Sequence, residues 1–126
     1  MTVRGVRGAT TIDEDNPQNI LAATRELLEA LLEANPDLRA EDIASCIFTL
    51  TDDLHSIYPA QAARQFGWSS VPLLCAREIA VMDGLPLCVR VLIHWNTHLT
   101  QDQVKHVYLR KAKSLRPDLQ GDTELL

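Results

Sequence analysis

The segment from Leu85 to Trp95, LPLCVRVLIHW, restricts the fold more than any other part of the chain. Its alternate residues are large and apolar: Leu87, Val89, Val91, Ile93 and Trp95. Side chains of a strand point alternately to opposite faces, so this set predicts a strand with one face on a core. Arg90 lies in the opposite set. If Arg90 is buried it needs an anionic partner, because an unpaired buried charge is costly; otherwise it faces solvent.

Two helices are predicted by caps and by the spacing of apolar residues. Asn16 can cap a helix that begins at Pro17 and ends near Asn35. Apolar residues recur there at intervals of three, four and seven, which predicts one buried face. A short helix is expected over residues 59–65, with Gly67 ending it.

Three further strands are expected over residues 2–12, 43–51 and 71–75. Pro72 places the last of them at an edge or a strand beginning, since proline cannot donate to a ladder. A third helix is expected from Thr100 to about residue 113, because Thr100 and a glutamine three residues later fit a capping box. This order predicts an α+β domain with a mixed β-sheet and helices on one face.

The length of 126 residues predicts a single domain, 1–126, in which the polar residues from about 116 to 126 form a flexible tail. No apolar run is long enough for a membrane span, and we expect neither a membrane partner nor a signal peptide. The net charge of −5 disfavours nucleic acid as a partner. Three cysteines, an odd number, favour free thiols and a cytoplasmic location.

Five side chains are candidates for chemistry: Arg7, Cys75, Glu78, Arg90 and Tyr108. Each has an ordinary alternative role, as a surface strand arginine, a small buried thiol, a solvated loop glutamate, a solvent-facing arginine or a core aromatic. No metal, nucleotide-loop or Ser-His-Asp pattern is found in the sequence, and we expect no metal site. Arginines with one glutamate suit a dianionic small molecule held by charge-assisted hydrogen bonds.

Seven segments carry a resemblance to a known family: VRGVRGATT at 3–11, TDDLHSIYPA at 51–60, GW at 67–68, VPLLCAREI at 71–79, GLPLCVRV at 84–91, QDQVKHVYL at 101–109 and SLRPDL at 114–119. Together they resemble the monofunctional AroH-type chorismate mutases over nearly the whole chain. The resemblance implies a homotrimer with a pseudo-α/β-barrel core and active sites in the clefts between subunits. It also implies the Claisen rearrangement of chorismate to prephenate, on the route to phenylalanine and tyrosine, with no cofactor.

The resemblance further implies roles for individual residues. Arg90 matches the arginine that reaches the ether oxygen and a carboxylate, and Arg7 one that binds a substrate carboxylate. Glu78 and Cys75 match the pair that contacts the ring and its hydroxyl, and Tyr108 the tyrosine near the enolpyruvyl carboxylate.

The remaining implied contacts lie at the pocket wall and mouth. The neighbouring subunit would supply Tyr58 and Ala60, and the wall would include Leu73 and Leu74. The mouth and the closing tail would include Arg64, Leu115 and Arg116. Gln61 and Leu74 depart from the lysine and threonine found in relatives.

Two other functions remain open on the residues alone. An anion-binding or amino-acid-binding regulatory module would account for Arg7 and Arg90 but does not explain why Glu78 lies near Cys75 in the sequence. A small trimeric hydrolase or deaminase would need an activated water, and we find no base or metal pattern to make one.

Overall fold

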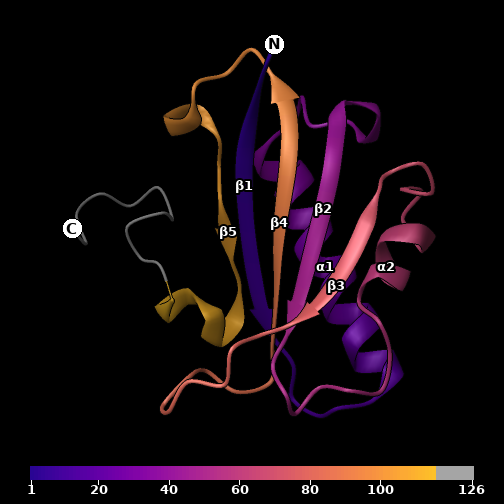
Figure 1. Cartoon of the computed structure of the whole chain (residues 1–126), viewed down its shortest axis with the longest axis vertical. Helices are drawn as coiled ribbons and strands as arrows, with labels where there is room; N and C mark the ends of the chain where they lie inside the picture. The colour runs from indigo at the N-terminus through magenta and orange to yellow at the C-terminus, as the bar shows by residue number, and fades with distance from the viewer. Residues whose placement is uncertain (116–126) are drawn as a thin grey trace.

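The structure, a computed structural model that describes residues 1–115, contains one five-stranded mixed sheet (Figure 1). The strand order is β3-β2-β4-β1-β5. The strands are β1 (Thr2–Thr11), β2 (Ile43–Leu50), β3 (Leu73–Arg77), β4 (Cys88–Thr97) and β5 (Val107–Tyr108). β4 pairs antiparallel with β1 and β2, whereas β3 runs parallel to β2 and β5 parallel to β1. The predicted tail and Arg116 lie outside the described residues.

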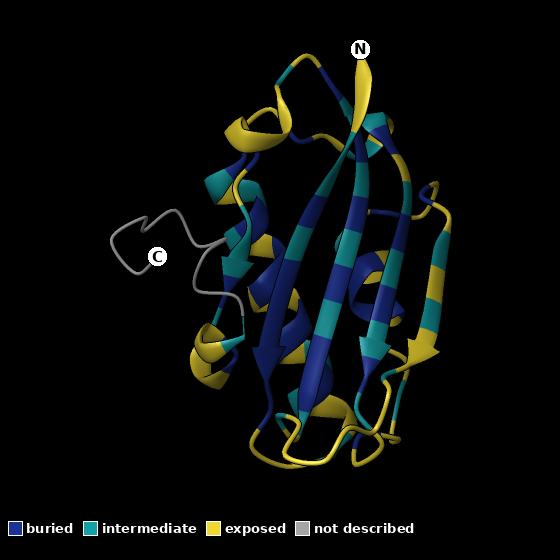
Figure 2. Cartoon of the chain, turned by 60° about the vertical axis from the view of Figure 1, so that its left-hand side comes forward, coloured by how far each residue is buried: buried dark blue, intermediate teal, exposed yellow. Residues whose placement is uncertain are grey.

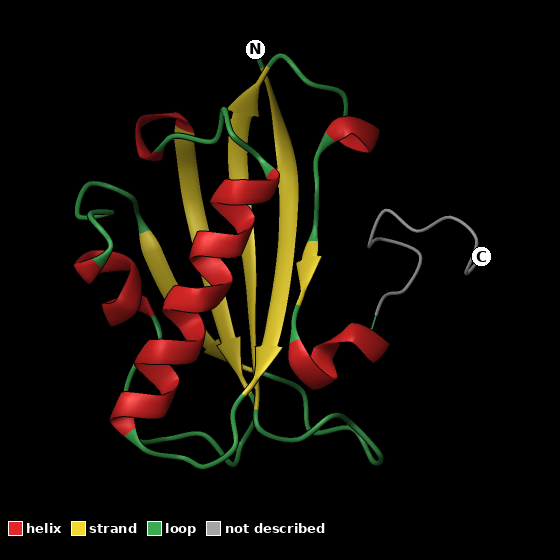
Figure 3. Ribbon diagram, turned by 180° about the vertical axis from the view of Figure 1, so that it is seen from behind, coloured by secondary structure: helices red, strands yellow, loops and turns green. Residues whose placement is uncertain are grey.

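Two α-helices, α1 (Pro17–Ala34) and α2 (Ala60–Gln65), cover one face of the sheet (Figure 3). Asn16 caps α1 as predicted, since its side chain accepts a 2.8 Å hydrogen bond from the backbone N–H of Asn19. Gly67, with φ of 99°, follows α2. The α+β class and the helices on one face are therefore confirmed. None of the helices within residues 1–115 is both long and apolar enough to cross a membrane.

The core lies between α1 and the sheet. The side chains of β4 alternate as its sequence predicts, with Val89, Val91, Ile93 and Trp95 buried against the helices (Figure 2). α1 packs tightly on β1 at Gly8, where an added Cβ would lie 3.0 Å from a methyl group of Leu31. Glycine at this position therefore sets the distance between the helix and the sheet.

The helix predicted over residues 100–113 is wrong. The capping box is present, but it opens only a 3-10 turn (Gln101–Gln103), which is followed by β5 and a second 3-10 turn (Arg110–Ser114). The outer edge of β1 explains the difference. That edge needs hydrogen-bond partners, and the backbone of β5 supplies them at Gly8 and Ala9.

Buried Asn35 fixes the start of this extended segment. Its amide nitrogen donates to the carbonyl oxygens of Leu31, at 3.0 Å, and Lys105, at 2.8 Å. Its amide oxygen accepts from the backbone N–H of Lys105 at 2.9 Å. One side chain thus joins the end of α1 to the residues that lead into β5.

We expect Asn35→Ala to lower the free energy of unfolding by about 3 kcal/mol, because the buried amide makes three hydrogen bonds that each contribute about 1 kcal/mol. Urea unfolding at fixed protein concentration measures the change, with Asp37→Ala, at an exposed position two residues along the chain, as the control. Equal stability of the two variants would contradict this role for Asn35.

Candidate active site

A cavity of about 330 Å³ opens on the sheet face that the helices leave uncovered. It brings together four of the predicted site residues: Arg7, Glu78, Arg90 and Tyr108. They come from β1, the residue after β3, β4 and β5, which no local sequence pattern links. Sheet pairing brings them together, because Ala9, Arg90 and Thr49 are directly opposed across β1, β4 and β2.

Arg90 has the anionic partner that its place in the strand demands. Its Nε lies 3.5 Å from Oε2 of Glu78, and the two side chains are 32% and 24% exposed. The alternative of a fully solvent-facing arginine is therefore wrong. Nε is nevertheless buried and makes no hydrogen bond to any residue of the described chain. Arg90 is paired by charge while this donor stays available to another acceptor.

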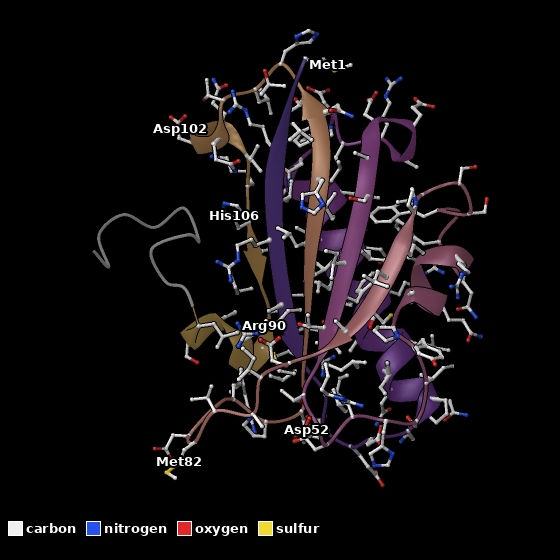
Figure 4. The ribbon with its side chains drawn as sticks, in the orientation of Figure 1. Met1, Asp52, Met82, Arg90, Asp102 and His106 are labelled. Carbon is white, nitrogen blue, oxygen red and sulfur yellow. The ribbon has the colours of Figure 1, made fainter. Side chains whose placement is uncertain are left out.

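Glu78 is held by two bonds to β2. Its backbone N–H donates to the carbonyl oxygen of Leu50 at 2.8 Å, which continues the pairing just beyond the end of β3. The hydroxyl of Thr49 donates to Oε2 of Glu78 at 2.5 Å. The carboxylate therefore has a defined position in the cavity lining, beside Arg90, which Figure 4 shows in the lower part of the sheet.

The backbone of Arg7 is fixed by side chains from the segment that precedes β5. Nδ1 of His106 accepts the N–H of Arg7 at 2.9 Å. At Gly5, two residues before Arg7, the side-chain amide of Gln101 makes two hydrogen bonds to the backbone. It accepts from the N–H of Gly5 at 3.0 Å and donates to the carbonyl oxygen of Gly5 at 2.7 Å. These side chains extend the β1–β5 pairing beyond β5 itself. Of the two cavity arginines, only Arg90 has an acidic partner within residues 1–115, so the cavity carries net positive charge.

Tyr108 lies on β5 opposite Ala9, not on a helix as predicted. It is buried, and Leu115 packs against the same small cluster. The structure therefore places Leu115 against the cluster that contains Tyr108, near the end of the described chain.

The other predicted residues line a separate hollow of about 240 Å³ at the edge of the sheet: Tyr58, Ala60, Arg64, Leu73, Leu74 and Cys75. Cys75 pairs with buried Phe48 across β2 and β3, so it points to the helix-covered face. Thr49, the next residue of β2, points to the cavity face. Within one chain, Cys75 and Glu78 thus lie on different surfaces although only two residues separate them.

Burial raises the pKa of the Cys75 thiol above its usual value, and the backbone N–H of Ala60 and the charge of Arg64 only partly oppose this. Burial also raises the pKa of Cys46 to about 12. Cys75 is therefore a thiol at neutral pH and suits hydrogen bonding, not nucleophilic attack.

The cavity residues that the sequence analysis missed include Ile47, Thr49 and Leu92. A signal for two of them exists in the strand at 43–50. Cys46, Phe48 and Leu50 form its apolar set, so Ile47 and Thr49 had to face the other way. What the alternation does not show is that Glu78 approaches this face.

The cavity offers two guanidinium groups, one carboxylate and a tyrosine from rigid strands. Such a site can bind a small dianion, and Arg90 and Glu78, 3.5 Å apart, can place positive and negative charge against neighbouring parts of that molecule. Within residues 1–115, no cluster of side chains is suited to hold a metal ion.

Comparison with known proteins agrees with the resemblance found in the sequence. The family model for chorismate mutase type I matches residues 3–119. Chorismate mutase AroH of Thermus thermophilus is 57% identical over 119 residues, covering 94% of this chain and 98% of that protein. Chorismate mutase AroH of Bacillus subtilis (strain 168) is 44% identical over 120 residues, covering 94% of each.

A solved structure supports the fold directly. Chorismate mutase from Clostridium thermocellum superposes with a TM-score of 0.85 at 45% sequence identity, covering 88% of this chain and 98% of that one. The matches extend over the strands that supply Arg7, Glu78, Arg90 and Tyr108. The chain belongs to the chorismate mutase type I family.

Proposed function

We propose that this protein catalyses the rearrangement of chorismate to prephenate, on the route to phenylalanine and tyrosine. The observation that carries the proposal is the buried Nε of Arg90, held 3.5 Å from Glu78 without a hydrogen bond in a positively charged cavity. The proteins reported above are named chorismate mutases, and none supports a non-catalytic anion-binding module. Loss of chorismate absorbance and formation of prephenate test the proposal directly.

The reaction needs no acid, base or nucleophile, because one C–O bond breaks while one C–C bond forms within the same molecule. The protein has to hold the enolpyruvyl chain over the ring and to match the charge that develops. Arg90 would donate to the ether oxygen as it becomes more negative, and Glu78 would face the ring fragment as it becomes more positive. Arg7 and Tyr108 would bind substrate carboxylates.

We also propose that the active protein is a homotrimer whose sites lie between subunits. The sheet face that carries the cavity has no helix over it, and it exposes apolar residues such as Val3 (50%) and Leu74 (62%). A second copy would cover this face and remove that surface from water. The hollow around Cys75 of the second copy would then complete the cavity around Arg90 of the first. Such an assembly would account for the separation of Cys75 from Arg90 within one chain.

In that assembly, Tyr58, Ala60, Leu73 and Leu74 would form the wall of the site, and Arg64, Leu115 and Arg116 its mouth. We place the protein in the cytoplasm, because free thiols persist in a reducing compartment.

Replacing Arg90 by citrulline keeps the shape of the side chain and removes its charge. We expect kcat to fall at least about 100-fold, which is typical when one donor to a developing anion is lost. The matched control is citrulline at Arg39, an exposed arginine outside the cavity. A decrease within about tenfold, roughly 1.4 kcal/mol, would remove charge stabilisation by Arg90 from the mechanism.

Mixed assemblies test whether each site is shared. Arg90→Ala removes one half of the site, and Leu74→Trp fills the hollow that forms the other half; each variant alone should be inactive. Refolded together in equal amounts, they should recover about a quarter of wild-type activity, because each mixed trimer contains one unaltered site. Mixed trimers, identified by native mass spectrometry, that show no recovery would contradict a shared site.

Cys75→Ser should retain substantial activity, because the serine hydroxyl still donates a hydrogen bond and no thiolate is needed. Cys75→Ala, which lacks the donor, should raise KM more than the serine variant does. Steady-state kinetics on both variants measures the difference. Complete loss of activity in a correctly assembled Cys75→Ser protein would instead indicate thiol chemistry.

A further inference from the structure

We propose that Thr49 is a positioning residue for Glu78: its hydroxyl holds the carboxylate so that Nε of Arg90 remains free to bind substrate. The inference rests on the proposed function, and it concerns a residue that contacts the catalytic carboxylate through its own side chain. Thr49 is not required for the fold of β2 as such, since a β-branched residue of any polarity suits that position.

The geometry places three groups around one oxygen atom. Oε2 of Glu78 accepts the Thr49 hydroxyl at 2.5 Å and lies 3.5 Å from Nε of Arg90. Thr49 and Arg90 are direct partners across β2 and β4, so both side chains start from fixed points of the sheet. The Thr49 hydroxyl therefore bonds the carboxylate from the β2 side, while Nε of Arg90 makes no hydrogen bond to it.

Within residues 1–115, the hydrogen bond from Thr49 is the one that this carboxylate accepts. Glu78 is the first residue after the edge strand, and the chain beyond it forms an exposed loop with Ile79 82% and Met82 88% exposed (Figure 4). The backbone bond to Leu50 fixes the main chain of Glu78 but not its side-chain torsions. Without the Thr49 hydroxyl, Nε of Arg90, 3.5 Å away, is a charged donor within reach of Oε2. A movement of about 0.6 Å would close that pair to hydrogen-bond length.

That closed pair would be less useful in catalysis. An Nε–H committed to Glu78 cannot donate to a substrate oxygen, and a carboxylate turned toward Arg90 is withdrawn from the ring. Substrate carboxylates would still bind Arg7. Loss of the Thr49 hydroxyl should therefore weaken stabilisation of the transition state more than binding of the substrate, so kcat should change more than KM.

Thr49→Val and Thr49→Ser provide the test, because valine keeps the shape without the hydroxyl and serine keeps the hydroxyl. We expect kcat of Thr49→Val to fall about tenfold with KM within about threefold, and Thr49→Ser to stay within about threefold of wild type. In a Glu78→Ala background, Thr49→Val should have almost no further effect. Ser45→Ala is the matched control, since Ser45 lies on the same face of β2 but bonds to His94.

A crystal structure of ligand-free Thr49→Val supplies a readout that does not depend on chorismate. We expect Glu78 to hydrogen-bond with Arg90 in that structure. An unmoved carboxylate, a wild-type kcat for Thr49→Val, or equal losses in the valine and serine variants at equal thermal stability would each overturn the inference. Absence of mutase activity in the wild type would instead overturn the proposed function, and the crystal structure would still decide the position of Glu78.

Discussion

The arrangement of this protein depends on a charged side chain in the middle of a central strand. β4 pairs on both sides, with β1 and β2, so Arg90 cannot leave the sheet without breaking two ladders. Its positive charge is compensated by the carboxylate of Glu78, the first residue after β3. Compensation by charge without a hydrogen bond keeps the guanidinium half-buried and still able to donate. The proposed catalysis uses that remaining capacity.

A second constraint is the separation of the two groups of site residues. One chain presents the arginines on its uncovered sheet face and presents Cys75 with its neighbours at the sheet edge. Cys75 pairs with buried Phe48 and so faces the helices, whereas Glu78, just after β3, bonds to Thr49 on the opposite face of β2. The proposed homotrimer joins an uncovered face of one subunit to an edge of the next. Burial of apolar surface would then form the assembly and complete the site at once.

The sequence predicts the regular elements well where the pattern is local. The cap at Asn16, the alternation in β4 and the edge position that Pro72 implies for β3 are all confirmed. Residues 100–113 show the limit of such reasoning. A correct capping box led to a wrong helix there, since the unpaired edge of β1 recruits this segment as β5 through long-range hydrogen bonds.

The sequence by itself determined the α+β class, the family resemblance and the need of a buried Arg90 for an anionic partner. Only the tertiary structure decided that Glu78 is that partner, that Thr49 holds it, and that Tyr108 reaches the cavity from a strand. The physical reason is distance along the chain. Spacing of residues encodes which face of one element is buried, but the register between strands, set by many hydrogen bonds and by packing at positions such as Gly8, determines which side chains meet.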